Sequence, residues 1–261
     1  MPSFAEAFTD DDIHRVLAYV KQFPEDKAYP PGDLNFFLPI RTLKAFPEDE
    51  VVLKTRYQDT DGEGAWRNVI EVEKRFGHRH QATLEFVHSV EDSDGSLDEM
   101  QVGWKTALTW SLPKQFILSG GANLAFPFDS GNQVEAIPYL ALGKGLSDSF
   151  SLQASARSHL PMEKFEEGDF EASAIVHWIR TPWPRGVFPG FEVTAKAPFE
   201  PGDDDAVQLS LTPQLHFGLS RGGHVRMNLG VEIPVTRRDY DFRAYAMLIW
   251  DFADGWFWKR W

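Results

Sequence analysis

The chain has 261 residues, of which 39 are acidic and 26 basic, so its formal net charge is −13. A charge of this sign excludes a surface that follows nucleic-acid phosphates, and no nucleic-acid partner is expected. The 14% aromatic content, with nine Trp and 21 Phe, exceeds what an ordinary soluble core holds and is typical of the two aromatic girdles of a transmembrane barrel.

The absence of cysteine limits the chemistry further. It excludes disulfides, thiolate metal sites and covalent haem attachment within the chain. No apolar run reaches the roughly 18 residues of a transmembrane helix. The N-terminus has no basic stretch followed by an apolar one, so no signal peptide is visible. Export would therefore require the chain to be a fragment or its true start to lie upstream.

A helix is predicted from Thr9 to about Phe23. Thr9 is suited to cap the helix, Asp12 lies at the capping-box distance, and Pro24 ends the pattern. Apolar residues at i, i+3, i+4 and i+7 form one stripe: Ile13, Val16, Leu17 and Val20. One interpretation is a plain amphipathic helix that lies on the rim of a barrel.

The other interpretation comes from a resemblance. The first 23 residues, MPSFAEAFTDDDIHRVLAYVKQF, resemble the C-terminal end of a class I c-type cytochrome. In that family a Met-Pro methionine is the distal haem ligand, and Met1 matches it. The Cys-x-x-Cys-His motif is missing, so no haem cofactor is expected in this chain, and haem c is expected only in a full-length parent. The resemblance implies that residues 1–23 are the remnant of a cytochrome domain whose start codon was misassigned.

Residues 24–49 carry five prolines and show no periodicity. They predict an extended linker, partly tucked into the mouth of the following domain.

Residues 50–261 break into about twelve segments that alternate apolar and polar side chains. In AVQLSLTPQLHFGLS the period of two holds along the whole segment. Soluble strands average about 5 to 6 residues, whereas a tilted strand needs about 9 to 11 to cross a bilayer, and these segments have the longer length. The sequence therefore predicts an all-β fold: an antiparallel transmembrane β-barrel of about twelve strands with a short N-terminal α-helix and an extended linker.

The connections alternate between long and short along the chain. QDTDGEGA, EDSDGSLDE and EPGDDDA are predicted to be long loops, whereas GHRH, PK and LSDS are predicted to be short turns. Because bacterial outer-membrane barrels have short periplasmic turns and longer outer loops, the pattern predicts an outer-membrane location with both termini in the periplasm.

The end of the chain carries a second resemblance. DFRAYAMLIWDFADGWFWKRW, which ends at the aromatic Trp261, resembles the last strand of outer-membrane barrels, which the barrel insertion machinery reads. Residues 46–261 as a whole resemble transporter-like barrels, including the porin-like group associated with phenol degradation. The resemblance implies outer-membrane lipid and the insertion machinery as partners, together with a periplasmic cytochrome if the N-terminal resemblance holds.

Strand parity predicts which polar side chains point into the lumen. They are Lys54, Arg56, Glu71, Glu73, Arg75, Glu85, Lys105, Arg157, His159, Glu171, His177, Glu192, Lys196, His216, Arg226, Glu232 and Arg243. Buried charges must be paired, so these residues form either a salt-bridged filling that stabilises a closed barrel or a polar conduit for a small solute.

No catalytic or metal-binding constellation stands out, so neither an enzyme nor a metal site is expected. DTDGEG begins like a calcium loop, but Ile70 stands where a bidentate Glu is needed. His78 and His80 lack further ligands nearby. His88 and Ser89 are adjacent on a strand and point to opposite faces, which excludes a lipid-facing hydrolase pair.

Two functions remain open. The first is a barrel for the passage of small solutes, linked to periplasmic electron transfer through the missing cytochrome domain. The alternative is a non-conducting barrel that anchors or docks a cytochrome at the outer membrane.

Overall fold

The structure is a computed structural model that describes residues 9–20, 32–91, 94–129, 131, 133–179, 186–200, 207–236 and 239–258. Met1, Trp261 and the first part of the predicted linker lie outside these residues. The described residues form α2 (Asp10–Val20), η1 (Gly32–Leu34), β1 (Glu50–Thr60), β2 (Glu63–Phe76), β3 (His80–Glu91), β4 (Asp94–Ser111), β5 (Phe116–Pro127), β6 (Glu135–Ser147), β7 (Phe150–Pro161), η2 (Phe165–Glu167), β8 (Asp169–Trp178), β9 (Val187–Pro198), β10 (Gln208–Gly218), β11 (Val225–Pro234) and β12 (Phe242–Asp251).

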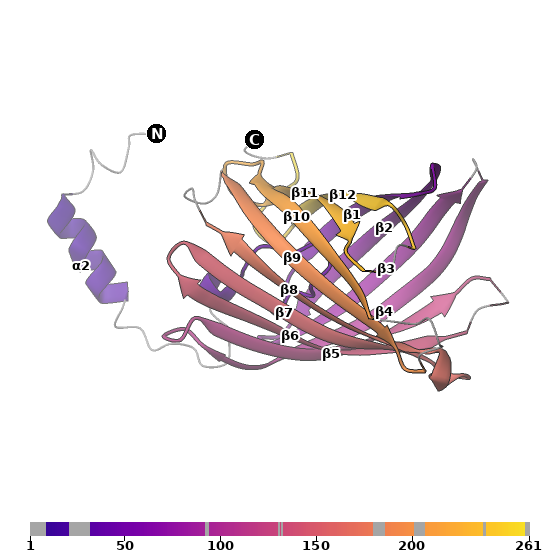
Figure 1. Cartoon of the computed structure of the whole chain (residues 1–261). Helices are drawn as coiled ribbons and strands as arrows, with labels where there is room; N and C mark the ends of the chain where they lie inside the picture. Colours follow the sequence, from indigo (N-terminus) through magenta and orange to yellow (C-terminus); the bar gives the residue numbers. More distant parts are fainter. Residues whose placement is uncertain are drawn as a thin grey trace.

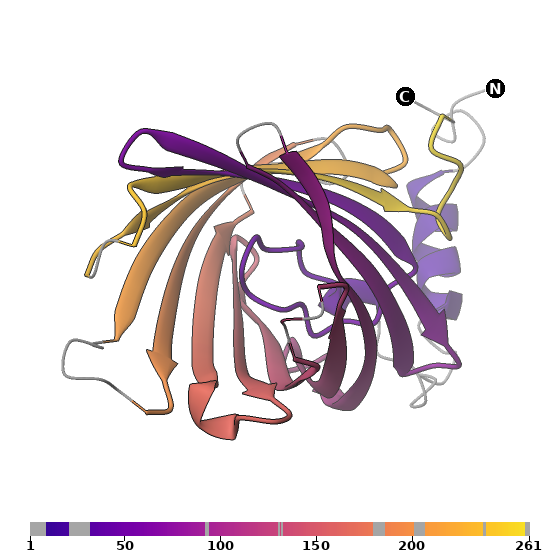
Figure 2. The same cartoon turned by 90° about the vertical axis from the view of Figure 1, so that its right-hand side faces the viewer.

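The strands form one closed barrel. Each strand pairs antiparallel with its neighbours along the chain, and β1 pairs with β12, so that Val52 lies opposite Ile249 at the closure. Figure 1 shows the tilted strands from the side, and Figure 2 shows the barrel after a quarter turn. The predicted antiparallel barrel of about twelve strands is confirmed.

The alternation of side chains gives the barrel two different faces. On β10, Ser210, Thr212, Gln214 and His216 are buried in the interior, whereas Leu215 is exposed on the outside. The other strands follow the same rule, because successive side chains of a strand point to opposite faces. Exposed apolar side chains on the outer face include Leu53, Trp66, Ile70, Trp104, Leu108, Leu140, Phe191, Leu229 and Ile233.

The two ends of the barrel are named here by what they carry. The terminal mouth is the end where β1 begins and β12 ends, and it also carries the turns at 77–79, 112–115, 148–149 and 219–224 and the connection from β8 to β9. The loop mouth is the opposite end, with the connections at 61–62, 92–93, 128–134, 162–168, 199–207 and 235–241.

Two of the predicted long loops are wrong. β1 runs to Thr60 and β2 begins at Glu63, so QDTDGEGA forms a tight hairpin whose turn residues Asp61 and Gly62 have φ of 52° and 85°. An Asp-Gly pair tolerates these left-handed angles and matches the twist of the strands that it joins. Likewise, β3 and β4 extend through most of EDSDGSLDE, and β4 spans 18 residues. The polar residues at these sites therefore belong to long strands that extend the barrel wall. The stretch DTDGEG, which begins like a calcium loop, forms the end of β1, the turn and the start of β2.

The helix α2 lies outside the barrel (Figures 1 and 2). Its capping box is confirmed, since the Asp12 N–H donates to Thr9 Oγ1 at 3.2 Å and the Thr9 N–H donates to Asp12 Oδ2 at 3.0 Å. Ile13 and Val16 are exposed. The side chains of Leu17 and Val20, and the helix end predicted at Phe23, lie outside the described residues. Within the described part of the chain, no helix is long and apolar enough to cross a membrane.

Candidate functional site

The barrel interior is the candidate site, and a segment of the chain's own backbone occupies part of it. Residues 32–49, here called the plug segment, run inside the barrel ahead of β1 (Figure 2). Their contacts reach strands from β3 to β11. The sequence predicted only a linker that enters the mouth, whereas the structure places this stretch deep in the lumen.

Phe37 forms the aromatic contact of the plug segment with the wall. Its ring stacks on Phe188 of β9 at 4.3 Å between centroids and packs on His216 of β10 at 4.8 Å. His177 of β8 meets it edge-on at 5.7 Å. The Gln153 side-chain amide donates to the Phe37 carbonyl at 2.6 Å. The ring thus contacts three neighbouring strands, and the backbone carbonyl of the same residue is bonded to a fourth.

Small residues make room for the plug segment. Gly230 lies so close to it that a Cβ there would be 2.4 Å from Ile40 Cδ1, and Gly143 stands in the same relation to Phe36, at 2.7 Å from Cδ2. A separate apolar cluster consists of Leu34, Ala45, Phe46, Ala107, Ile117 and Ala141. The segment is therefore packed against the wall like part of a core.

A buried carboxylate holds the middle of the plug segment. Glu192 accepts hydrogen bonds from the backbone N–H groups of Arg41 at 3.1 Å and Thr42 at 2.5 Å, and from the Gln214 side chain at 2.8 Å. Further bonds run from the Leu43 N–H to Ser155, from Ser119 to the Ala45 carbonyl, from Asn228 to the Leu38 carbonyl and from the Glu48 N–H to Gln81. Backbone groups that cannot reach water are in this way satisfied by wall side chains.

Charged side chains of the plug segment are also paired. Lys44 forms a buried ion pair with Glu48. Burial acts to raise the pKa of the Glu48 carboxyl, but the charges of Lys44 and Arg226 outweigh it and lower that pKa. At the terminal mouth Asp49 contacts Lys74 at 2.5 Å and Arg75 at 3.7 Å.

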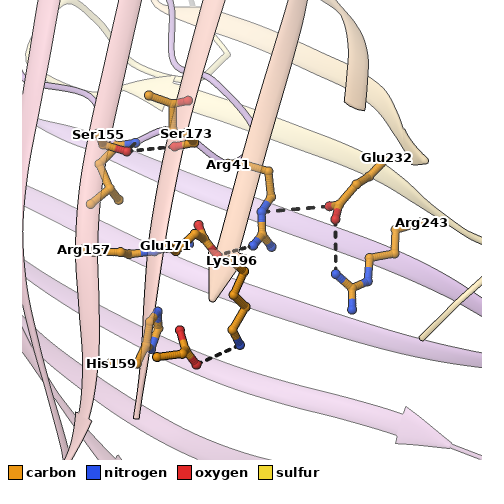
Figure 3. Close-up of polar contacts among 12 residues, drawn as sticks. Arg41, Ser155, Arg157, His159, Glu171, Ser173, Lys196, Glu232 and Arg243 are labelled. Carbon is orange, nitrogen blue, oxygen red and sulfur yellow. Dashed lines mark hydrogen bonds and ion pairs between the residues drawn. The ribbon is translucent and has the colours of Figure 1, made fainter. Parts of the chain in front are cut away.

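Arginines and glutamates meet on the loop-mouth side of the plug segment (Figure 3). Glu171 is shared by Arg41 at 2.6 Å and Arg157 at 2.5 Å. Glu232 is shared by Arg243 at 3.3 Å and Arg41 at 3.9 Å. Burial acts to lower the pKa of Arg41, yet the nearby carboxylates raise it well above its usual range, so this guanidinium stays charged. Two carboxylates thus form ion pairs with three guanidinium groups.

On the inner wall formed by β1 to β4, carboxylates are more frequent relative to basic side chains. Lys54 forms an ion pair with Glu71, and Lys105 lies 3.7 Å from Glu73. Nearer the terminal mouth, Glu50 and Arg226 pair at 2.9 Å.

The plug segment separates cavities of the interior. At the loop mouth a cavity of about 710 Å³ is lined by Glu99, Glu135, Lys196 and five arginines, here called the arginine cluster: Arg41, Arg56, Arg67, Arg157 and Arg243. A smaller cavity of about 190 Å³ lies between the plug segment and the wall, bordered by Leu38, Tyr139 and Tyr245. On the terminal side, another cavity of about 710 Å³ is lined by Phe37, Phe46 and Arg226. A solute that passes from one mouth to the other must pass the plug segment.

The structure places the predicted interior residues as follows. The loop-mouth and inner cavities are lined by Lys54, Arg56, Glu71, Glu73, Glu85, Lys105, Arg157, His159, Glu171, Lys196 and Arg243. Buried on the inner wall are His177, Glu192, His216, Arg226 and Glu232. Arg75 contacts Asp49 at the terminal mouth. Their roles in transport stay a prediction.

Sequence reasoning missed several residues of the interior. Arg67 has the same parity on β2 as Glu71 and lines both the inner cavity and the loop-mouth cavity, so extending the alternation would have found it. Arg41 and Lys44 lie in a segment without periodicity, and no sequence signal marks them.

The described residues bring together no three His, Asp or Glu side chains of the kind that a metal ion needs. His80 instead contacts Thr106 Oγ1 through Nδ1 at 3.0 Å. Met1, the residue that matches a haem ligand, lies outside the described residues.

Comparison with known proteins finds no matching family model and no matching curated protein. Among solved structures the chain is similar to a COG4313 outer membrane channel from Pseudomonas putida F1, with a TM-score of 0.59, 10% identity, and coverage of 85% of this chain and 98% of that one. It is similar to the NanC porin, with a TM-score of 0.57, 11% identity, and coverage of 76% and 97%. It is similar to the KdgM porin, with a TM-score of 0.55, 12% identity, and coverage of 78% and 99%. The chain has the fold of outer-membrane porins and channels.

Proposed function

We propose that this protein is an outer-membrane channel for small solutes. The observation that carries the proposal is the pairing of an apolar outer face with a charged interior that contains a large cavity at the loop mouth. Exposed apolar side chains over a whole barrel suit contact with lipid, and a polar lumen suits the passage of hydrated solutes. The porin neighbours support the same function through their shared fold.

The channel test is conductance in planar lipid bilayers. The full chain and a variant that lacks residues 32–47 are compared after both pass a heat-modifiability test of barrel folding. The variant is expected to give clear conductance steps because removing the plug segment joins the cavities on its two sides. Folded variant protein that gives no steps would refute the channel.

The alternative is a non-conducting barrel that anchors a periplasmic electron carrier. The plug segment favours it, since the segment is bonded to the wall throughout its length. This function predicts no conductance from the full chain, whereas the variant, whose lumen the deletion opens, conducts under either function. It also predicts that the folded barrel retains a soluble c-type cytochrome on vesicles.

The orientation that we propose has both termini in the periplasm. It rests on four of the six loop-mouth connections, such as 162–168, which are longer than the terminal-mouth turn at 148–149; the connections at 61–62, 92–93 and 179–186 depart from this rule. The chain has no cysteine, so single cysteines report accessibility cleanly. Asp129→Cys at the loop mouth should react with an impermeant maleimide on intact cells, and Ser149→Cys at the terminal mouth should not. Outer-membrane lipid and the barrel insertion machinery are the partners that this location implies.

The link to electron transfer stays a proposal that rests on the resemblance of the first 23 residues to a cytochrome end. Its test is the reading frame upstream of Met1. An in-frame Cys-x-x-Cys-His motif would support the link, and its absence would remove it. The resemblance to phenol-degradation-associated barrels is likewise a proposal, and growth of a deletion strain on phenol would test it.

A further inference from the structure

Arg56 stands apart from the other cations of the loop-mouth cavity because it has no counter-ion. Arg41 and Arg157 contact Glu171, Arg67 contacts Glu99 at 2.9 Å, and Arg243 contacts Glu232. Among the described residues, Arg56 makes no ion pair, and its buried Nε has no hydrogen-bond partner. Arg56 is half-buried, and a buried polar atom without a partner is costly, since its removal from water must be offset by a hydrogen bond.

The register of the sheet increases this cost. Arg56 on β1 lies directly opposite Arg67 on β2, and both side chains line the same two cavities. Like charges directly opposite each other destabilise a sheet. On the other side, β12 places Arg243 diagonal to Arg56, across from Gln58. Three neighbouring strands therefore present arginines to one region of the lumen.

The arginines of this region outnumber the carboxylates that contact them. Within the described residues, the cluster holds five guanidinium groups: Arg41, Arg56, Arg67, Arg157 and Arg243. Three carboxylates contact them: Glu99, Glu171 and Glu232. The cavity lining as a whole also holds Lys196 and the acidic Glu85, Glu135, Glu167, Asp169 and Asp239, so it carries no positive surplus. The imbalance is local: five guanidinium groups meet three contacting carboxylates, and among the described residues Arg56 is left without an ion-pair partner.

We propose that Arg56 is the centre of a binding site for a small anionic solute that carries a carboxylate or phosphate group. The guanidinium fork matches both groups in a bidentate geometry. Arg56 lines the loop-mouth cavity of about 710 Å³ and also the inner cavity of about 190 Å³ beside the plug segment. An anion there supplies the missing counter-charge and screens the Arg56–Arg67 repulsion. The proposal rests on the proposed channel function and names the solute class that the channel selects.

The test is equilibrium binding to the folded full chain in detergent, measured by titration calorimetry, so that it does not depend on conductance. Three probes of equal ring size are used: glucuronate, glucose 6-phosphate and glucose. At least one of the two anions is expected to bind, and glucose is not. Binding should weaken between about 50 mM and about 500 mM NaCl, because salt screens charge interactions. Which anion binds separates a carboxylate ligand from a phosphate ligand.

Variants assign the binding to Arg56. Arg56→Gln should lower the affinity by about tenfold or more, because a hydrogen bond to a charged group contributes about 1.5–3 kcal/mol. Arg56→Lys should keep part of the affinity, since it keeps the charge and loses the fork. Arg221→Gln is the matched control: the same change on an exposed turn of the terminal mouth, expected to leave affinity unchanged.

The outcomes are separable from those of the channel test. Arg56→Gln is expected to fold at least as well as the parent, since it removes a like-charge pair. Absence of binding by either anion, equal binding of glucose, or full affinity in Arg56→Gln would overturn the site. A chain that conducts without binding anions loses the site alone, and a chain that binds them without conducting loses the channel alone.

Discussion

Replacing Phe37 by alanine tests whether the plug segment controls the lumen. The ring is the point at which the segment meets the most aromatic neighbours, since it contacts Phe188, His216 and His177. Phe37 takes no part in the strand ladder. Its removal should therefore weaken docking of the plug segment and leave the barrel itself folded.

The size of the effect follows from packing. Truncating a core Phe to Ala costs about 3–5 kcal/mol, and because Phe37 is only half-buried the low end, about 3 kcal/mol, applies. The stacked pair with Phe188 contributes part of this, about 0.5–1.5 kcal/mol. Since each 1.4 kcal/mol changes an equilibrium by about tenfold, the undocked population should rise by about a hundredfold.

Trypsin provides the assay, because Arg41 and Lys44 lie in the plug segment and are shielded while it is docked. When docking is fast compared with cleavage, the rate of cleavage after these residues follows the undocked population. Phe37→Ala should raise that rate by about a hundredfold and raise the open probability in planar bilayers in parallel. Folding of the barrel is checked by heat-modifiable gel mobility.

Phe191→Ala is the control, because Phe191 lies on the same strand as Phe188 and points outward. It should leave cleavage and conductance unchanged. Unchanged cleavage in Phe37→Ala would show that packing at this ring does not hold the segment. Faster cleavage without any gain in conductance would show that the plug segment is no gate.

Three further predictions concern packing, polarity and lipid contact. Gly230→Ala should raise trypsin cleavage of the plug segment as well, because its Cβ would stand 2.4 Å from Ile40 Cδ1; unchanged cleavage would mean that the wall yields instead. His216→Phe should stabilise the barrel against urea by about 1–3 kcal/mol, because neither nitrogen of this buried ring finds a partner among the described residues. His80→Phe, which loses the contact with Thr106, should not stabilise it. Leu140→Arg, at the middle of β6 on the outer face, should cost about 2–4 kcal/mol for folding into vesicles, and no cost would argue against lipid contact.

The strands could be predicted from sequence because one rule governs each of them. On β10 every second side chain is polar from Gln208 to His216, and only a sheet with two different faces explains that period. The closed barrel was predicted because about twelve strands were each long enough to cross a bilayer. Parity also placed interior side chains such as Glu192 and Arg226, which are buried.

The plug segment could not be predicted in the same way. Arg41 contacts Glu171, 130 residues away along the chain, and no local period announces such a contact. The wall residues that make room for the plug segment, such as Gly230, cannot be told in the sequence from any other glycine within a strand. The hairpin at Asp61 was missed for another reason: an Asp-Gly turn has the composition of a long loop, and its length is set by backbone angles.

The two halves of the lumen differ in how their charges are paired, which bears on the choice between a salt-bridged filling and a polar conduit. Beside the plug segment, charges are paired in contacts such as Lys44 with Glu48, as a stabilising filling requires. In the loop-mouth half, Arg56 faces Arg67 without a counter-ion. Buried ion pairs add little stability, and a surplus of like charge subtracts from it, so stability alone does not account for this half. The proposed anion accounts for it, because it supplies the counter-charge that Arg56 lacks among the described residues.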